Sequence, residues 1–83
     1  MKYYVYILKS LKNNDFYIGS TEDIDKRFRL HNQGKVKSTK GYRPWKLLEH
    51  QEFYSRSEAT RQEMFLKTHQ QKEILKKKYE MVT

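Results

Sequence analysis

The sequence predicts a small α+β domain in which strands and helices are interspersed along the chain. Residues 3–10 and 16–19 are rich in aromatic and β-branched side chains, which indicates two neighbouring strands. Residues typical of helix N-termini stand near positions 23 and 55, each before a segment that reads as a helix. With 83 residues, the chain suits one domain with a modest core, and we expect residues 1–83 to form that single domain.

The first two strands are predicted to form a hairpin around the turn-forming segment Lys-Asn-Asn-Asp at residues 12–15. If the two asparagines are the turn residues, Ser10 pairs with Tyr17. Because side chains alternate between the faces of a strand, this register puts Tyr6 and Tyr17 on one face of the sheet. A slip of one residue would separate the two tyrosines.

The remaining elements follow from capping residues and apolar spacing. A first helix is predicted over about 23–33, a basic loop over 35–44 and a third strand over 45–53. A serine followed three residues later by a glutamate forms a capping box, which starts a second helix at about 55–68. A third helix, rich in lysine, is predicted over about 70–79.

The composition favours a polyanionic partner. Eighteen lysines and arginines against ten acidic residues give a net charge of +8, which attracts phosphate backbones, although a basic surface can also serve solubility alone. The absence of cysteine excludes disulfides and thiolate nucleophiles and fits a reducing compartment, so we expect the cytoplasm. Lys9 interrupts the apolar N-terminal stretch too early for a signal peptide or a membrane span, and we expect no membrane partner.

Five side chains are candidates for chemistry. Arg27 and His31 are four residues apart on the predicted first helix, so they share one face, where the arginine is either a surface charge or a phosphate ligand. Glu63 borders the apolar face of the second helix, where it either pairs with a nearby basic residue or binds Mg²⁺. Tyr6 and Tyr17 belong to the core or the sheet surface, unless nearby cations lower a phenol pKa enough for proton transfer.

Taken in order, these residues resemble the GIY-YIG nuclease family, and most closely its small single-domain bacterial members. The resemblance extends from about Tyr4 to beyond Lys67 and rests on the following residues: Tyr4-Val5-Tyr6, Tyr17-Ile18-Gly19, Arg27, His31 and Glu63. It implies a three-stranded antiparallel sheet flanked by three helices. Tyr4 replaces the glycine of the family name, and Ser20 stands where some relatives carry a lysine.

The resemblance also implies a metal-dependent endonuclease that hydrolyses DNA phosphodiester bonds to 5′-phosphate and 3′-hydroxyl ends, with a structure-selective role in DNA repair or recombination. By this likeness Glu63 holds Mg²⁺ or Mn²⁺, and Arg27 contacts the scissile phosphate. Tyr17 is the first choice for the proton acceptor, while Tyr6 shares that task or orients the attacking water. His31 is expected to hydrogen-bond a phosphate or a tyrosine. A protein partner or the shape of the DNA would select the substrate.

Four basic residues of the predicted loop are expected to bind the nucleic-acid backbone: Lys35, Lys37, Lys40 and Arg43. Tyr42 and Trp45 offer flat surfaces for stacking on unpaired bases, although a tryptophan belongs more often to a core. The residues leave two alternatives open, which are a non-catalytic or partner-dependent nucleic-acid-binding module and a role on RNA. They also leave the oligomeric state open.

Overall fold

The computed structural model describes residues 1–80, in which the chain forms a three-stranded antiparallel sheet with strand order β2-β1-β3. Along the chain the elements are β1 (Tyr3–Ser10), β2 (Phe16–Thr21), α1 (Ile24–Asn32), the short 3-10 helix η1 (Lys40–Tyr42), β3 (Trp45–Phe53), α2 (Arg56–Leu66) and α3 (His69–Glu80). The predicted α+β class, with three antiparallel strands and three flanking helices, is confirmed.

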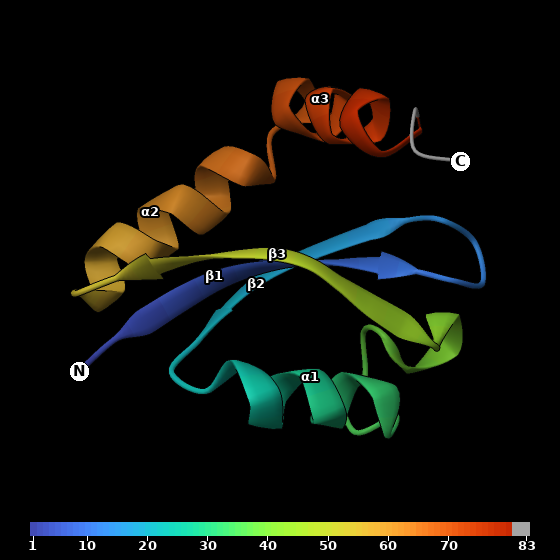
Figure 1. Ribbon diagram of the computed structural model, residues 1–83, viewed down its shortest axis with the longest axis horizontal. Coiled ribbons are helices and arrows are strands. Elements are labelled where there is room, and N and C mark those ends of the chain that lie inside the picture. The colour runs from blue at the N-terminus through green and yellow to red at the C-terminus, as the bar shows by residue number, and fades with distance from the viewer. Residues whose placement is uncertain (81–83) are drawn as a thin grey trace.

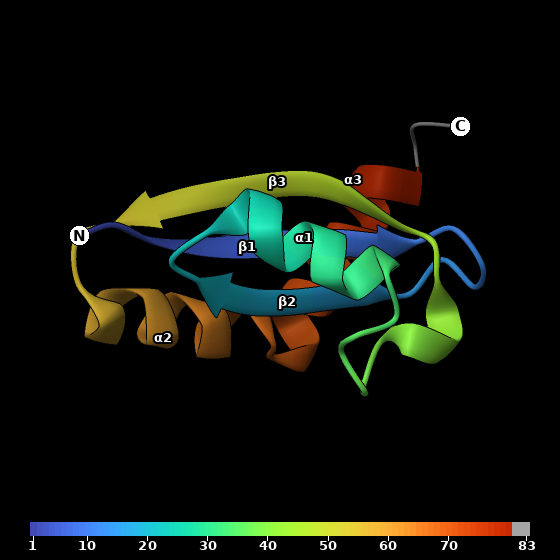
Figure 2. The same ribbon diagram turned by 90° about the horizontal axis from the view of Figure 1, so that it is seen from below.

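The central strand β1 is buried on both of its faces. Val5 and Ile7 pack in the core beneath α2 and α3, whereas Tyr6 and Leu8 belong to a second core on the α1 side. Figure 1 shows α1 on one side of the sheet and both later helices on the other. In the view from below, α1 crosses in front of the strands and α2 lies on the β2 side (Figure 2). Burial on two faces explains why β1 reads as a continuous apolar run.

The hairpin register differs by two residues from the predicted one, because Tyr17 pairs with Leu8 and not with Ser10. The turn is longer than two residues. Asn14 adopts a left-handed φ of 66°, and the Ser10 hydroxyl accepts hydrogen bonds from two backbone amides of the turn at 3.1 and 3.2 Å. Since the shift is even, Tyr6 and Tyr17 still lie on the same face of the sheet.

The helices begin where capping residues predict. Asp23 accepts a hydrogen bond from the amide three residues ahead at 3.1 Å, and Ser55 does the same for α2 at 3.2 Å. The second helix ends at Leu66, two residues before its predicted end, and α3 begins at His69. The predicted basic loop contains the 3-10 helix η1. Each helix within residues 1–80 is too short or too polar to span a bilayer.

Candidate active site

Four of the five predicted site residues form one cluster between the sheet and α1. The hydroxyl oxygen of Tyr6 lies 3.0 Å from Nε2 of His31. The ring centroid of Tyr17 is 4.9 Å from that of His31 and 6.3 Å from that of Tyr6. Arg27 is one turn before His31 on α1, and the nearby Tyr6 and Tyr17 side chains raise the pKa of its guanidinium. The fold therefore brings two phenols, an imidazole and a guanidinium together from three elements.

Gly19 leaves the space in which the Tyr6 hydroxyl lies. The two residues are directly opposite each other across β1 and β2. A β-carbon at Gly19 would stand 2.6 Å from the hydroxyl oxygen of Tyr6 and 3.1 Å from a ring carbon of Tyr17. Any side chain at this position would displace the phenol. The signal in the sequence is a glycine inside a strand, which marks a close approach of another group.

His31 is neutral at pH 7. Its side chain is fully buried, and burial, helped by the positive charge of Arg27, lowers the pKa of His31 to about 4. Both ring nitrogens have partners, since Nδ1 lies 2.8 Å from the hydroxyl oxygen of Thr39. Of the two predicted partners of His31, a tyrosine and a phosphate, the structure provides the tyrosine.

Tyr6 stays a neutral phenol at pH 7. Burial raises the pKa of Tyr6 to about 12, although the nearby guanidinium of Arg27 works in the opposite direction. The same contact with Tyr6 raises the pKa of Arg27, so the guanidinium keeps its charge. A buried phenol that ionises this reluctantly is a poor proton acceptor, which argues against the expected sharing of that role with Tyr17. Tyr17 is the more exposed of the two.

Glu63 comes from α2 and is held at the β2 edge of the sheet. Ser20 donates a hydrogen bond to Oε1 of Glu63 at 2.7 Å, and the ammonium group of Lys67 contacts Oε2, also at 2.7 Å. Burial opposes ionisation, but these two bonds lower the pKa of Glu63 below its ordinary value. The pairing with a neighbouring basic residue, which the sequence left as one alternative, is therefore present.

The carboxylate of Glu63 belongs to a different face of the sheet from the tyrosine cluster, and its contacts within residues 1–80 are with Ser20 and Lys67. The two groups are nevertheless close. Ser20 directly follows Gly19, the residue beneath the Tyr6 hydroxyl. The negative charge of Glu63 also contributes to the raised pKa of Tyr6.

The donor set at this edge fits a divalent cation with one protein ligand. Within the described part of the chain, no three His, Asp or Glu side chains are grouped so that they could enclose a metal ion. Mg²⁺ does not need such a group, since one or two carboxylates, waters and substrate phosphates commonly complete its coordination. The Glu63 side chain is ionised and 20% exposed, so it can supply that one carboxylate.

The basic loop presents its charges to solvent. All four residues predicted to bind nucleic acid are exposed, and none has a carboxylate oxygen within 4.0 Å among residues 1–80: Lys35, Lys37, Lys40 and Arg43. Tyr42, at 47% exposure, remains open for stacking. Trp45 is only 5% exposed and belongs to the α1-side core, so it is not the stacking surface considered from the sequence.

The loop is attached to the tyrosine cluster by residues that the sequence did not single out. Thr39 is buried, and the indole nitrogen of Trp45 donates to its carbonyl oxygen at 3.0 Å. Asn32, at the end of α1, accepts a hydrogen bond from the Trp45 amide at 2.6 Å and donates to its carbonyl at 3.1 Å. A threonine among lysines looks like an ordinary loop residue, so composition carries no signal for its burial.

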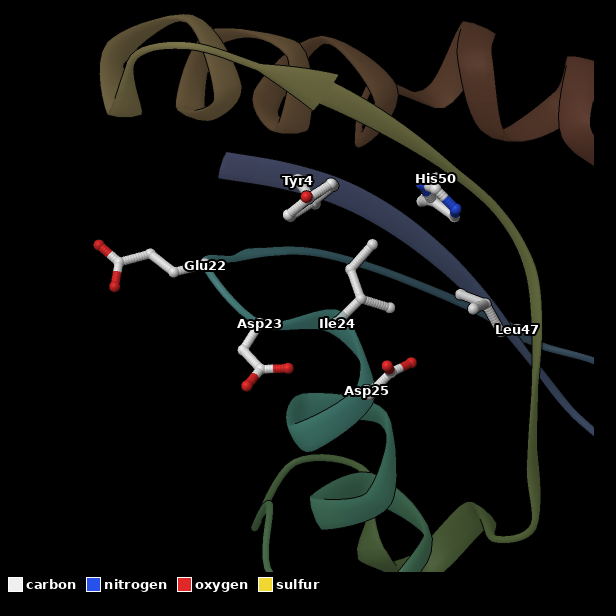
Figure 3. A pocket seen from close by; sticks show the side chains of 7 residues that line it. All are labelled: Tyr4, Glu22, Asp23, Ile24, Asp25, Leu47 and His50. Carbon is white, nitrogen blue, oxygen red and sulfur yellow. The ribbon is translucent and has the colours of Figure 1, made fainter. Parts of the chain in front are cut away.

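A separate open pocket of about 380 Å³ lies at the N-terminal end of α1, on the β3 side of the sheet (Figure 3). Its lining residues include Glu22, Asp23 and Asp25, together with Tyr4 and His50, and the carboxylates of Glu22 and Asp23 point away from Tyr4 and His50 (Figure 3). It contains none of the five predicted site residues.

Comparisons with known proteins agree with this geometry. The family model for the GIY-YIG catalytic domain matches residues 2–80. The UPF0213 protein SH2523 of Staphylococcus haemolyticus is 43% identical over 76 residues, which cover 90% of this chain and 92% of that protein. The UPF0213 protein YazA of Bacillus subtilis is 37% identical over 75 residues, which cover 87% of this chain and 75% of that protein.

A solved structure is also similar. The solution NMR structure of the UPF0213 protein BH0048 from Bacillus halodurans matches with a TM-score of 0.56 and 38% sequence identity, covering 95% of this chain and 86% of that one. These matches support a nuclease-type domain. The chain belongs to the GIY-YIG family, whose domains act on nucleic acid and generally use divalent metals.

Proposed function

We propose that the protein is a divalent-metal-dependent endonuclease that hydrolyses phosphodiester bonds of DNA. The single observation that supports this most strongly is the position of the ionised Glu63 carboxylate. Ser20 of β2 holds it by a hydrogen bond, and the preceding residue of β2, Gly19, lies beneath the Tyr6 hydroxyl. Glu63 lies on the other face of the sheet from the tyrosine-arginine cluster, and β2 connects the two, with Ser20 on one face and Gly19 on the other. Branched, flapped or nicked DNA of repair and recombination in the cytoplasm is the proposed substrate class.

The side chains divide the reaction between them. Arg27 carries five N–H donors and a permanent charge, so it binds the scissile phosphate and stabilises the charge that develops there. Tyr17 is partly exposed and beside the cationic Arg27, which favours the phenolate, and in that form it accepts a proton from the attacking water and becomes a phenol. Tyr6 remains a phenol whose oxygen orients that water, and His31 fixes the phenol. The P–O3′ bond breaks, which leaves a 5′-phosphate and a 3′-hydroxyl.

Glu63 would hold Mg²⁺ or Mn²⁺. When bound, such a cation supplies positive charge for the leaving oxygen. Ser20 keeps the carboxylate in place at the β2 edge, and Lys67 neutralises it while no other cation is present. The exposed charges of the basic loop attract the backbone without reading the sequence, so selection among DNA molecules rests on their shape or on a protein partner.

Cleavage assays test the proposal. Nicked, flapped, four-way-junction and linear DNA, with an RNA of matched sequence, are incubated with the protein in Mg²⁺ or Mn²⁺. We expect cleavage of DNA by the wild type, and a loss of about 100-fold or more in Glu63→Gln and Arg27→Ala. Glu58→Gln, on the exposed start of α2, is the matched control and should retain activity. Binding of DNA by all four proteins without cleavage would instead identify a non-catalytic module, and preferential cleavage of RNA a role on RNA.

A further inference from the structure

A buried chain of hydrogen bonds leads from the tyrosine cluster into the basic loop. The Tyr6 hydroxyl contacts Nε2 of His31 at 3.0 Å, and Nδ1 of the same ring contacts the Thr39 hydroxyl at 2.8 Å. That hydroxyl in turn lies 3.4 Å from the carbonyl oxygen of Val36, a long contact. Tyr6, His31 and Thr39 are 2%, 0% and 1% exposed, so bulk solvent does not compete for the hydrogen bonds that join them.

The donors and acceptors in this chain of hydrogen bonds permit only one placement of the protons. The Thr39 hydroxyl donates to the carbonyl oxygen of Val36, so its oxygen accepts from Nδ1 of His31. A neutral imidazole carries a single proton, so with Nδ1 protonated Nε2 is unprotonated and accepts the proton of the Tyr6 hydroxyl. In the opposite tautomer the Tyr6 proton would have no acceptor among residues 1–80.

The backbone of the loop holds the Thr39 hydroxyl in place. The amide of Thr39 donates to the carbonyl of Val36 at 3.1 Å, and its own carbonyl accepts from the buried indole of Trp45 at 3.0 Å. The backbone of Thr39 is thereby fixed on both sides, which restricts where its hydroxyl can lie. A buried threonine that served packing alone would not need its hydroxyl oriented toward an imidazole nitrogen.

We propose that Thr39 is a positioning residue of the nuclease, whose hydroxyl holds His31 in the Nδ1–H tautomer. His31 then accepts the proton of Tyr6, which leaves the lone pairs of the Tyr6 oxygen free to accept hydrogen bonds. The effect on cleavage rests on the proposed function, whereas the tautomer of His31 does not depend on it. Thr39 also joins the loop that carries the exposed basic residues to the site.

Long-range ¹⁵N NMR spectra of the imidazole test this assignment at pH 7. We expect the wild type to show Nδ1 with the shift of a protonated nitrogen and Nε2 with that of an unprotonated one. Thr39→Val removes the acceptor at nearly constant volume, so this pattern should become mixed or reversed, while Thr39→Ser should retain it. Thr60→Val, at an exposed position of α2, is the control for a valine substitution. Melting curves check that each variant is folded.

In the cleavage assay we expect Thr39→Val to lower kcat at least about 10-fold, because the tautomer is no longer held, with KM for DNA unchanged and activity restored in Thr39→Ser. A wild-type spectrum with the proton on Nε2 would overturn the proposal even if the valine variant did not fold. An unchanged spectrum and kcat in Thr39→Val would overturn it too. The expected tautomers without any cleavage by the wild type would support the role of Thr39 toward His31 and contradict the nuclease function instead.

Discussion

Ser20 and Glu63, which are 43 positions apart in the sequence, are joined by a hydrogen bond of 2.7 Å between the serine hydroxyl and Oε1 of the carboxylate. Ser20 follows Gly19, over which the Tyr6 hydroxyl lies on the other face of the sheet. One strand, β2, therefore positions both the Glu63 carboxylate and the tyrosine cluster. The contributions of its residues can be tested separately.

Removing the Ser20 hydroxyl should weaken metal binding. In Ser20→Ala the Glu63 carboxylate loses an orienting donor, and the loss of such a partner typically lowers metal affinity about 10-fold or more. Calorimetric titration with Mn²⁺ measures the effect. Ser57→Ala, on the exposed surface of α2, is the matched control. Equal Mn²⁺ affinities in the wild type and Ser20→Ala would show that Ser20 does not position a metal ligand.

Gly19→Ala should destabilise the protein and abolish cleavage. The added β-carbon would stand 2.6 Å from the Tyr6 hydroxyl oxygen, so the phenol must move away from His31, at a cost of about 1–3 kcal/mol. Gly41→Ala makes the same chemical change where no atom lies within 4 Å. Urea unfolding of the two variants provides the comparison. If both retain wild-type stability, the close approach at Gly19 has been overestimated.

Stability should fall as the pH decreases from 7 to 5. Burial lowers the pKa of His31 to about 4, whereas an unfolded histidine has a pKa of about 6.5. Between these values the unfolded chain binds more protons, so the free energy of unfolding decreases by about 2 kcal/mol from pH 7 to pH 5. His31→Gln should lose most of this dependence, measured by urea unfolding, and the exposed substitution His50→Gln should keep it. The same slope in all three proteins would contradict a buried neutral His31.

DNA affinity should depend on salt through the basic loop. Each phosphate contact that is lost lowers the slope of log affinity against log salt concentration by about 0.9. We therefore expect a shallower slope for the double variant Lys35→Gln and Lys37→Gln, measured by fluorescence anisotropy. The control removes two exposed lysines of α3, with Lys72→Gln and Lys77→Gln. A larger change of slope in the control would indicate that DNA binds along α3 and not along the loop.

Local signals made most of the fold predictable. Capping side chains at Asp23 and Ser55 satisfy the first free amides of their helices, and the apolar run of β1 reflects burial on both faces of the sheet. The hairpin register was wrong because the left-handed Asn14 and the acceptor role of Ser10 depend on the geometry of the whole turn. Composition alone does not distinguish this longer turn from a two-residue turn.

The order of the residues along the chain pointed to the components of the site, and their roles remain predictions. Sequence periodicity placed Glu63 beside the apolar face of its helix, but the lateral position of α2 along the β2 edge is a tertiary property. The contributions of Ser20 and Thr39 were not predictable either, and the glycine at position 19 indicates a close approach without naming its partner. Each depends on one contact with a residue far away in the sequence, and neither spacing nor composition reports such contacts.

The most direct measurement is anomalous diffraction from crystals of the protein soaked in Mn²⁺. We predict an anomalous peak against the Glu63 carboxylate at the β2 edge, with the ammonium group of Lys67 moved away from Oε2. A Glu63 carboxylate still paired with Lys67, with no peak beside it at Mn²⁺ concentrations that support cleavage, would contradict the assignment of Glu63 as the metal ligand.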